Sequence, residues 1–378
     1  MQKTSNLIQT VFFGLFITAF FLLFLIIPDI GFSAQENREL TQAPKLNFDT
    51  LFSGQFASKF ESYSNDQFPF RDSWITFKAG SELALGKKEN KGVYLCEGET
   101  LVEAYNSPDR VQLDTNIAAV NSLTVNADIP VYFCLVPGIS EINSEIVPKN
   151  APNDSQKEII DYAYSISNAT NIDMLAALKA HSDEYIFYRT DHHWTSLGAF
   201  YGYEAIMDAM GRGAAPLSGF NRRVVTDEFY GTIYSKSGFS WVAPDEIEIF
   251  SDQDEGISVY NFLSEGDEVT SIYDFTMLEK KDKYSMFMGG ISPLIKVVSA
   301  NTEGKRLLIL RDSYADSLIP FIQSEFSEIH MMDLRYYKTQ LYESSLTEYI
   351  TQNGIDEVLV IYSTGNFGTD VNVALMGQ

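Results

Sequence analysis

The chain has 378 residues, of which 45% are hydrophobic and 13% aromatic, so it can bury a substantial core in one large or two medium domains. It carries 51 acidic and 27 basic residues and a formal net charge of −24. A charge of this sign and size repels phosphate backbones and anionic lipid headgroups. We therefore expect no nucleic-acid partner and no electrostatic docking on a membrane surface.

The N-terminus carries an apolar run from Leu7 to Ile27. As a helix this run spans about 30 Å, the thickness of the hydrocarbon layer of a bilayer. Lys3 precedes it and Asp29 follows, which places the N-terminus in the cytoplasm and the rest of the chain outside. A cleaved signal peptide is the alternative, but the run is long for one and the small pair Ser33–Ala34 lies some way beyond it. We predict a cytoplasmic tip and single-span anchor over residues 1–28.

Residues 29–85 are expected to form a linker followed by an amphipathic helical segment. Aromatic residues recur there at helical spacing, and Pro69 breaks the pattern. We expect these aromatics to pack the helix on the following domain. They are Phe52, Phe56, Phe60 and Tyr63.

Residues 86–378 have the pattern of a single α/β domain. Gly92 to Glu103 predicts a β-hairpin. Ile129 to Pro137 is a continuous apolar run, typical of a strand buried on both faces, and helical patterns at 111–125 and 155–168 flank it. Alternation of strands and helices favours a mainly parallel sheet with helices on both sides.

Further elements follow along this domain. Residues 185–188 predict a second buried strand, and residues 211–280 predict a small β-rich insertion. Three later apolar runs, at 307–310, 328–333 and 357–362, predict strands, and a helix is expected from Leu318 to Phe326.

Two of the four histidines are adjacent, in Asp191-His192-His193-Trp194, between the expected strand at 185–188 and a helix at 195–210. In open α/β sheets, ligands bind at such strand ends. In an extended segment Asp191 and His193 point the same way and His192 points the opposite way, although spacing alone does not choose between the histidines. This pattern indicates the acid–base half of a hydrolase-like site.

Ser313 supplies the matching nucleophile. It follows the strand at 307–310 in a sharp polar turn, an arrangement that exposes its Oγ and lets backbone N–H groups face an oxyanion. Serine acyl transfer needs a hydroxyl, a base and a carboxylate that holds the base. Asp312, the neighbour of the serine, points away and is interpreted as a cap of the turn.

Other polar and aromatic residues receive more ordinary interpretations. Trp194 is expected to pack the catalytic loop, in preference to binding sugar. Arg335 is expected either to contact substrate or oxyanion or to form a structural ion pair. His181 and His330 are interpreted as structural, and the two cysteines, Cys96 and Cys134, as free thiols in strands.

Several blocks resemble the DHHW protein family, which is similar to the SGNH-hydrolase-like proteins of alginate O-acetylation. The resemblance implies a three-layer α/β/α domain in which Asp191 orients, His193 acts as base and Ser313 as nucleophile, and His192 falls on the variable position of an Asp-x-His motif. Tyr314, Arg335, Trp194 and His192 are the candidate substrate or oxyanion residues. The resemblance implies no metal or organic cofactor, and a membrane-bound acyltransferase as acetyl donor. The blocks are Asp191–Trp194, Asp312–Phe321, Asp333–Tyr337, Glu36–Arg38 and Lys281–Tyr284.

Two positions depart from the family pattern. Ile291 follows Gly289-Gly290 where the family has asparagine, and Gly138-Ile139 stand where it has a lysine. Without that asparagine, backbone N–H groups near Ser313 and Tyr314 must stabilise the oxyanion. The departures keep open a catalytically inactive polysaccharide-binding or cell-surface protein.

The sequence thus predicts a membrane-anchored, extracytoplasmic O-acetyltransferase or acetylesterase that acts on a cell-surface or secreted polysaccharide. A metal-dependent phosphoesterase is the second alternative, because Asp191, His192 and His193 are metal-ligand types. Such an enzyme needs further aspartates in Asp-x-Asp blocks after strands, and the sequence has none in that context.

Overall fold

The computed structural model describes residues 2–250, 257–261, 268–341 and 344–377. The chain divides into two compact units, which are described separately. The first is Met1–Asn90 with Ser235–Trp241, and the second is Lys91–Tyr234 with Val242–Gln378. The sequence analysis begins the large domain at residue 86 and assigns 235–241 to its insertion.

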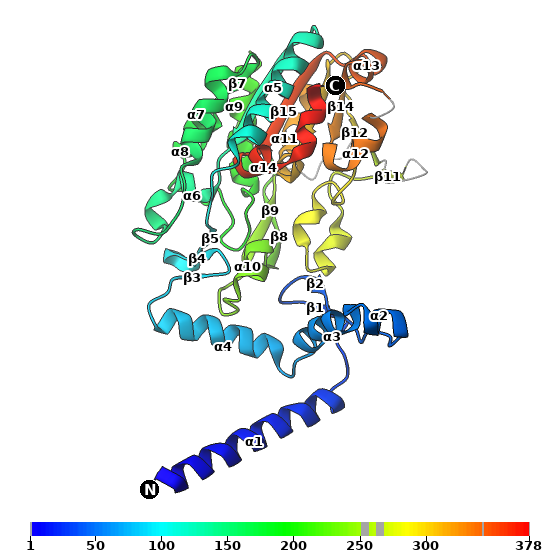
Figure 1. Cartoon of the computed structure of the whole chain (residues 1–378). Helices are drawn as coiled ribbons and strands as arrows, with labels where there is room; N and C mark the ends of the chain where they lie inside the picture. Colours follow the sequence, from blue (N-terminus) through cyan, green and yellow to red (C-terminus); the bar gives the residue numbers. More distant parts are fainter. Residues whose placement is uncertain (1, 251–256, 262–267, 342–343, 378) are drawn as a thin grey trace. The chain divides into compact units, whose positions relative to one another are not determined.

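The first unit begins with the predicted apolar helix, α1, over Gln2–Ile26 (Figure 1). Within it, Thr4–Ile26 has a mean hydropathy of 2.3 and is long and apolar enough to cross a membrane, a property that signal sequences share. The other elements of this unit are β1 Phe32–Ser33, β2 Arg38–Glu39, α2 Phe48–Phe52, α3 Gln55–Asp66, α4 Arg71–Ala84 and β3 Glu89–Asn90.

An ion-pair cluster ties the start of this unit to the α3–α4 corner. Arg38 bonds both carboxylate oxygens of Asp66, at 2.5 and 3.0 Å, and Glu36 accepts from Arg71 at 2.6 Å. The Glu36–Arg38 block, which the sequence analysis singles out, therefore fixes local structure.

The aromatics of α2 to α4 are not packed as expected. Phe52 is 85% exposed and Phe60 45% exposed, so the prediction that they pack the helix on the domain is wrong. Helices α2 and α3 bury no residue, and the one buried residue of α4 is the small Ala79, 1% exposed, near Gly238. Helical spacing predicted the helix, but it did not reveal which face would be buried.

The second unit is built on an eight-stranded sheet with the order β11-β10-β12-β14-β13-β15-β6-β7. Neighbours from β14 to β7 are parallel, and the pairs β14–β12, β12–β10 and β10–β11 are antiparallel. The strands are β6 Val131–Val136, β7 Thr170–Ile172, β10 Ser258–Asn261, β11 Glu268–Thr270, β12 Leu294–Val298, β13 Arg306–Arg311, β14 Glu328–Met332 and β15 Glu357–Ser363.

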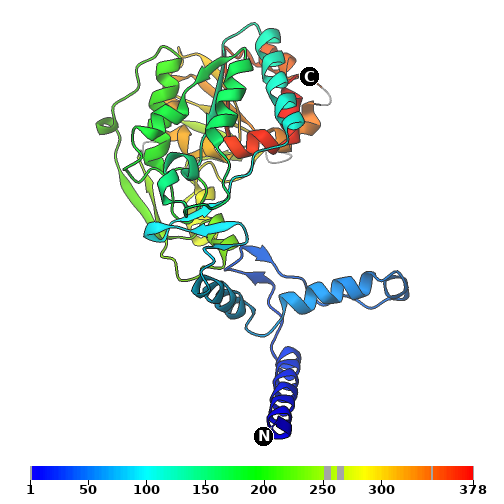
Figure 2. The same cartoon turned by 60° about the vertical axis from the view of Figure 1, so that its left-hand side comes forward.

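Helices cover both faces of this sheet, as Figure 2 shows. Alternate residues of β6 enter different cores, with Phe133 on one side and Cys134 on the other. Helices α5, α7, α13 and α14 contribute to the first core, and α8, α9 and α11 to the second. The predicted mainly parallel α/β/α architecture is therefore confirmed.

The α-helices of this unit are α5 Arg110–Asn126, α6 Ile139–Ile142, α7 Gln156–Ile166, α8 Met174–Lys179, α9 Ser196–Ala209, α11 Ile319–Ile322, α12 Leu334–Leu341, α13 Leu346–Asn353 and α14 Thr364–Thr369; α10 Thr232–Ser237 runs into the first unit. Short 3₁₀ turns include η5 Lys283–Met286, η6 Ser313–Leu318 and η8 Val371–Gly377. Outside the central sheet lie the predicted hairpin, β4 Val93–Leu95 and β5 Leu101–Glu103, and a two-stranded ribbon, β8 Arg223–Phe229 and β9 Asp245–Ile249. Cys96 and Cys134 are free.

Two sequence predictions, those at 185–188 and 318–326, differ from the structure, whereas the 211–280 insertion is β-rich as expected. Residues 185–188 are a buried loop, held by bonds from Tyr188 N to His193 O and from Thr195 N to Ile186 O, and the strand beside β6 is instead β7. The described part of the 211–280 insertion contributes β10 and β11 to the edge of the central sheet; residues 251–256 and 262–267 lie outside the described residues. The expected helix at 318–326 is a single α-helical turn, Ile319–Ile322, flanked by 3₁₀ turns.

Candidate active site

Asp191, His193 and Ser313 form a continuous hydrogen-bonded chain. His193 Nδ1 lies 2.6 Å from Asp191 Oδ1, and His193 Nε2 lies 2.7 Å from Ser313 Oγ. The aspartate and histidine are buried, at 2% and 4% exposed, whereas the serine is half-buried. His193 and Ser313, which the sequence placed at the ends of separate strands, thus lie in hydrogen-bond contact although 120 positions separate them in the chain.

The carboxylate of Asp191 determines the orientation of the imidazole. Oδ1 also accepts from His193 N, while Oδ2 accepts from Thr232 N at 2.7 Å and Thr232 Oγ1 at 2.9 Å. Because the carboxylate can only accept, the ring proton of His193 lies on Nδ1, and the lone pair of Nε2 faces the serine. This is the arrangement that a general base requires.

Gly231 makes this packing possible. A Cβ at this position would lie 2.3 Å from Asp191 Cβ and 2.4 Å from Asp191 Oδ2, distances that no side chain tolerates. The close approach of the Gly231 backbone brings the following Thr232 onto the carboxylate. Sequence reasoning missed both residues, because nothing in their spacing links them to a motif forty positions earlier.

Asp191 remains ionised in this environment. Burial by itself would raise the pKa of its carboxyl group. The neighbouring His192 and His193, with the hydrogen bonds from His193 and Thr232, outweigh burial and hold the pKa well below its ordinary range. An ionised carboxylate at this point can stabilise the imidazolium that forms when His193 takes a proton.

Asp312 organises the turn that carries the serine. As predicted, it caps the turn, accepting from Tyr314 N at 3.1 Å. It also accepts from Ser363 N, Ser363 Oγ and Asn366 Nδ2, at 2.8–2.9 Å. Its buried carboxylate therefore connects the end of β13 to the end of the neighbouring strand β15.

The same contacts show which N–H groups near Ser313 are already engaged. Tyr314 N, which was expected near the oxyanion, donates to Asp312 Oδ1. Ser313 N has no partner among the described residues. Asn366 uses one amide hydrogen on Asp312 and has a second to offer, and the sequence did not single it out. Its position four residues after the predicted strand at 357–362 was the available signal.

Two tyrosines enclose the imidazole. The Tyr284 ring is stacked on His193, with centroids 3.8 Å apart, and its hydroxyl lies 3.1 Å from both Ser313 O and Ser317 Oγ. Tyr314 packs against His193 with centroids 5.1 Å apart, and its hydroxyl donates to His192 O. Tyr284 belongs to the Lys281–Tyr284 block, but its role was not predicted.

Trp194 supports the loop from beneath, as expected for a packing residue. It is fully buried, and its Nε1 donates to Tyr314 O at 3.0 Å and Ser317 Oγ at 2.9 Å. A Cβ on Gly202 of α9 would lie 2.8 Å from the indole, so helix and ring are in close contact. Trp194 does not line the neighbouring cavity.

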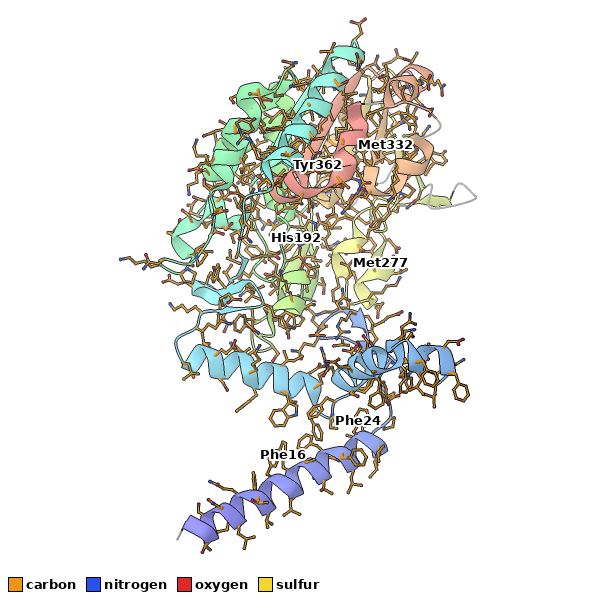
Figure 3. The ribbon with its side chains drawn as sticks, viewed as in Figure 1. Phe16, Phe24, His192, Met277, Met332 and Tyr362 are labelled. Atoms are coloured by element: carbon orange, nitrogen blue, oxygen red, sulfur yellow. The ribbon has the colours of Figure 1, made fainter. Side chains whose placement is uncertain are left out.

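A cavity of about 590 Å³ adjoins the triad. His192, labelled in Figure 3, lies on its wall with its Nδ1 2.8 Å from Thr232 Oγ1, so the expectation that it points to the opposite side is wrong. Strict alternation fails because the segment is a loop. The described residues of the wall include no lysine or arginine, and Glu103 is the one acidic group. Other polar wall residues are Tyr105, Asn106, Ser140, Gln156, Ser363, Asn366 and Thr369.

Arg335 lies in α12 and not on the cavity wall. Its guanidinium donates to both carboxylate oxygens of Asp333, at 2.9 and 2.6 Å, which is the ion pair that the sequence analysis kept as an alternative. Ile291 is 60% exposed and also absent from the wall, whereas Gly138 and Ile139 line it.

The two remaining histidines have structural partners. His181 pairs with Glu184 at 2.8 Å, and the buried His330 bonds Tyr349 and Glu328, both at 2.6 Å. Both agree with the structural role expected from the sequence.

Asp191, His192 and His193 are also a candidate cation site, since their ligand atoms lie within 4.8 Å of one another. These atoms are already engaged. Asp191 Oδ2 accepts from Thr232, both ring nitrogens of His193 are hydrogen-bonded, and His192 Nδ1 faces Thr232 Oγ1. A cation would have to displace the contacts that orient the base, so the geometry favours proton transfer over metal ligation.

Comparison with protein families gives one match, to the family described as DHHW protein, over residues 80–332. No curated protein matches the chain. The predicted family is therefore confirmed.

Solved structures resemble this chain, and the two with a TM-score above 0.5 show the same fold. A DHHW family protein from Eubacterium siraeum DSM 15702 is 24% identical, with a TM-score of 0.64 over 76% of this chain and 95% of that one. Bacillus cereus PatB1 is 20% identical, with a TM-score of 0.61 over 73% and 97%. The O-acetyltransferase domain of Pseudomonas putida AlgJ is 14% identical, with a TM-score of 0.48 over 76% and 98%.

Proposed function

Because the chain belongs to the DHHW protein family, we propose that it is a serine O-acetyltransferase or acetylesterase whose nucleophile is Ser313. The observation that carries the proposal is the pair of contacts of His193, 2.6 Å to Asp191 and 2.7 Å to Ser313. Nucleophile, base and orienting carboxylate in this order are the requirements of acyl transfer through serine.

In the first half-reaction, His193 Nε2 takes the hydroxyl proton as Ser313 Oγ attacks the carbonyl carbon of an acetyl ester. The carbonyl oxygen becomes an oxyanion, to which Ser313 N and Asn366 Nδ2 donate. The bond to the donor alcohol then breaks, and that alcohol leaves with the proton from His193. An acetyl group remains on Ser313 Oγ.

The second half-reaction reverses these roles. An acceptor hydroxyl gives its proton to His193 Nε2 and attacks the acetyl carbon, the bond to Ser313 Oγ breaks, and the serine recovers its proton. A sugar hydroxyl as acceptor makes the protein a transferase, and water makes it an esterase. Asp191 stabilises the imidazolium in both halves.

We further propose that the acceptor is a polysaccharide outside the cytoplasm. The cavity of about 590 Å³ has the size of a small-molecule site, and its wall offers hydroxyl and amide groups that suit sugar hydroxyls. With Glu103 as the one charged wall residue among those described, an uncharged sugar fits better than a uronate.

We also propose a membrane location and an acetyl donor for the protein. Helix α1 anchors the chain in the cell membrane as a single span, with the second unit on the extracytoplasmic side. A membrane-bound acyltransferase, which the family resemblance implies, supplies the acetyl groups. The length and hydropathy of α1 support the anchor.

The experiment is turnover of p-nitrophenyl acetate by the full chain in detergent. Ser313→Ala and His193→Ala should each lower the rate at least about 10³-fold, while Ser324→Ala, at an exposed serine outside the site, should leave it unchanged. Equal rates in all four proteins would contradict the triad. Inactivation by a chelator would favour the phosphoesterase. Oligosaccharide binding without turnover, unaffected by Ser313→Ala, would favour a binding protein.

A further inference from the structure

The first unit exposes an unusual number of large aromatic side chains on its short helices. They lie outside the matched family region except for the end of α4, and the proposed chemistry does not use them. The most exposed are Phe48 at 79%, Phe52 at 85%, Phe70 at 59% and Phe77 at 67%, with Phe60 at 45%, Phe68 at 42% and Trp74 at 40%.

Three of these side chains share one face of α4. Phe70, Trp74 and Phe77 follow the spacing i, i+4 and i+7, so they project from one side of α4. Ala79 is buried against Gly238, around the helix from that side. The helix therefore already has a packed face, and the aromatic side chains project from a second, largely exposed one. We call Phe48, Phe52, Phe60, Phe68, Phe70, Trp74 and Phe77 the aromatic face.

The aromatic face is continuous with the apolar helix α1. Phe20 of α1 lies against Phe68 and Trp74, with ring centroids 5.4 and 5.8 Å apart. Phe24, labelled in Figure 3, lies 5.4 Å from Tyr63. An apolar cavity of about 330 Å³ separates α1 from α3 between Phe16 and Phe60.

We propose that the aromatic face rests in the interfacial layer of the same lipid bilayer that α1 spans; this inference rests on the proposed anchoring of α1 and is independent of the acyl-transfer chemistry. Phenyl and indole rings concentrate at this depth, and amphipathic helices lie there in the membrane plane. The contacts of Phe20 and Phe24 place the face beside the C-terminal part of the apolar run, the part nearer to the interface that Asp29 follows.

Charge contributes little to this docking. Acidic residues outnumber basic ones in the segment 48–85, so anionic headgroups are not attracted to it. Burial of apolar area is the driving force, and zwitterionic lipid is sufficient. The charged residues are Asp49, Lys59, Glu61, Asp66, Arg71, Asp72, Lys78 and Glu82.

The test uses Trp74, one of three tryptophans, and α1 contains none. The full chain is reconstituted in phosphatidylcholine vesicles whose acyl chains carry bromine, a quencher of tryptophan fluorescence. Quenching is expected to be stronger with bromine near the glycerol end than near the chain terminus. The quenching should be lost in Trp74→Phe and kept in Trp241→Phe. Trp194 is fully buried, so it should contribute no quenched signal in either variant.

Two results would overturn the proposal. Absence of quenching in vesicles of lipid alone would mean that the face is covered by something else, such as a membrane protein. Quenching that persists in Trp74→Phe would assign the signal to Trp241. Esterase turnover of the same variants in detergent should equal that of the unaltered chain, so a failure here is distinct from a failure of the triad.

Discussion

The ring of Tyr284 lies parallel to the imidazole of His193, with centroids 3.8 Å apart and an angle of 8° between the planes. The tyrosine comes from η5, a segment separate from both halves of the triad. Its hydroxyl lies within 3.1 Å of Ser313 O, so one side chain contacts the base and the residue of the nucleophile together. Tyr284 therefore fixes the plane in which His193 can approach the serine.

Removal of this ring should impair the proposed chemistry without removing a reacting group. Tyr284→Ala is expected to lower kcat for an acetyl ester by on the order of 10–10²-fold, because the imidazole gains freedom to rotate away from Ser313. Tyr284→Phe keeps the stacking and should stay within about threefold. Steady-state kinetics on both variants check this, and equal losses in the two would assign the effect to the hydroxyl and not to the ring.

Asn366 provides a test of the oxyanion donors. Asn366→Ala should lower kcat about 10²-fold with little change in KM, because its amide acts only when the oxyanion develops. Ser363→Ala is the matched control, since Ser363 Oγ also donates to Asp312 Oδ2, at 2.8 Å. If both variants lose activity equally, the role of Asn366 is to position Asp312.

Acid should weaken the ion-pair cluster of the first unit. The hydrogen bond from Arg38, with those from Thr41, outweighs burial and holds the pKa of Asp66 well below its ordinary value. As the pH falls below about 4, the unfolded chain binds a proton at Asp66 that the folded chain does not. The stabilisation by the ion-pair cluster is therefore fully present above about pH 4, and it is lost as the pH falls through the pKa of Asp66 in the folded chain.

Asp66→Asn should therefore lower the free energy of unfolding by about 1 kcal/mol at neutral pH, a figure reduced by solvent screening. The deficit should shrink as the pH falls below about 4. Thermal unfolding of both proteins across this range measures it, with Asp72→Asn as a control, because Asp72 is half exposed and its nearest basic atom is 3.4 Å away. A deficit independent of pH would contradict the ionic origin.

Arg335 should matter for stability and not for turnover. Asp333 is 1% exposed, and Arg335→Ala removes the two donors on its carboxylate, which should cost about 1–2 kcal/mol. Esterase kcat should stay within about twofold, since the guanidinium is absent from the cavity wall. Lys338→Ala, an exposed cation on the same helix, is the control. A large fall in kcat would contradict this and show that Arg335 acts in turnover.

The sequence was most informative where apolar residues run without interruption. Strands β6, β13, β14 and β15 were predicted because central parallel strands are buried on both faces. The same reasoning failed at 185–188, since a buried loop needs the same composition, and it overlooked β7, whose residues Thr170-Asn171-Ile172 are short and mostly polar.

Only some residues of the candidate site could be predicted from the sequence. Asp191, His193 and Ser313 stood out because rare residue types gathered at strand ends. Tyr284 and Asn366 did not, because their importance depends on which side chains they meet after folding. The orientation of His192 was missed, because alternation describes extended strands and not the hydrogen-bonded loop that holds it.

The order of the sheet also decides when the site can exist. Synthesis delivers Asp191 and His193 long before Ser313, and β13 reaches β6 only through β15, which lies between them. Residues 357–363 form β15. Until they have been synthesised and have joined the sheet, β13 has no strand that connects it to β6. A chain that ends before β15 therefore lacks the strand that joins β13 to β6.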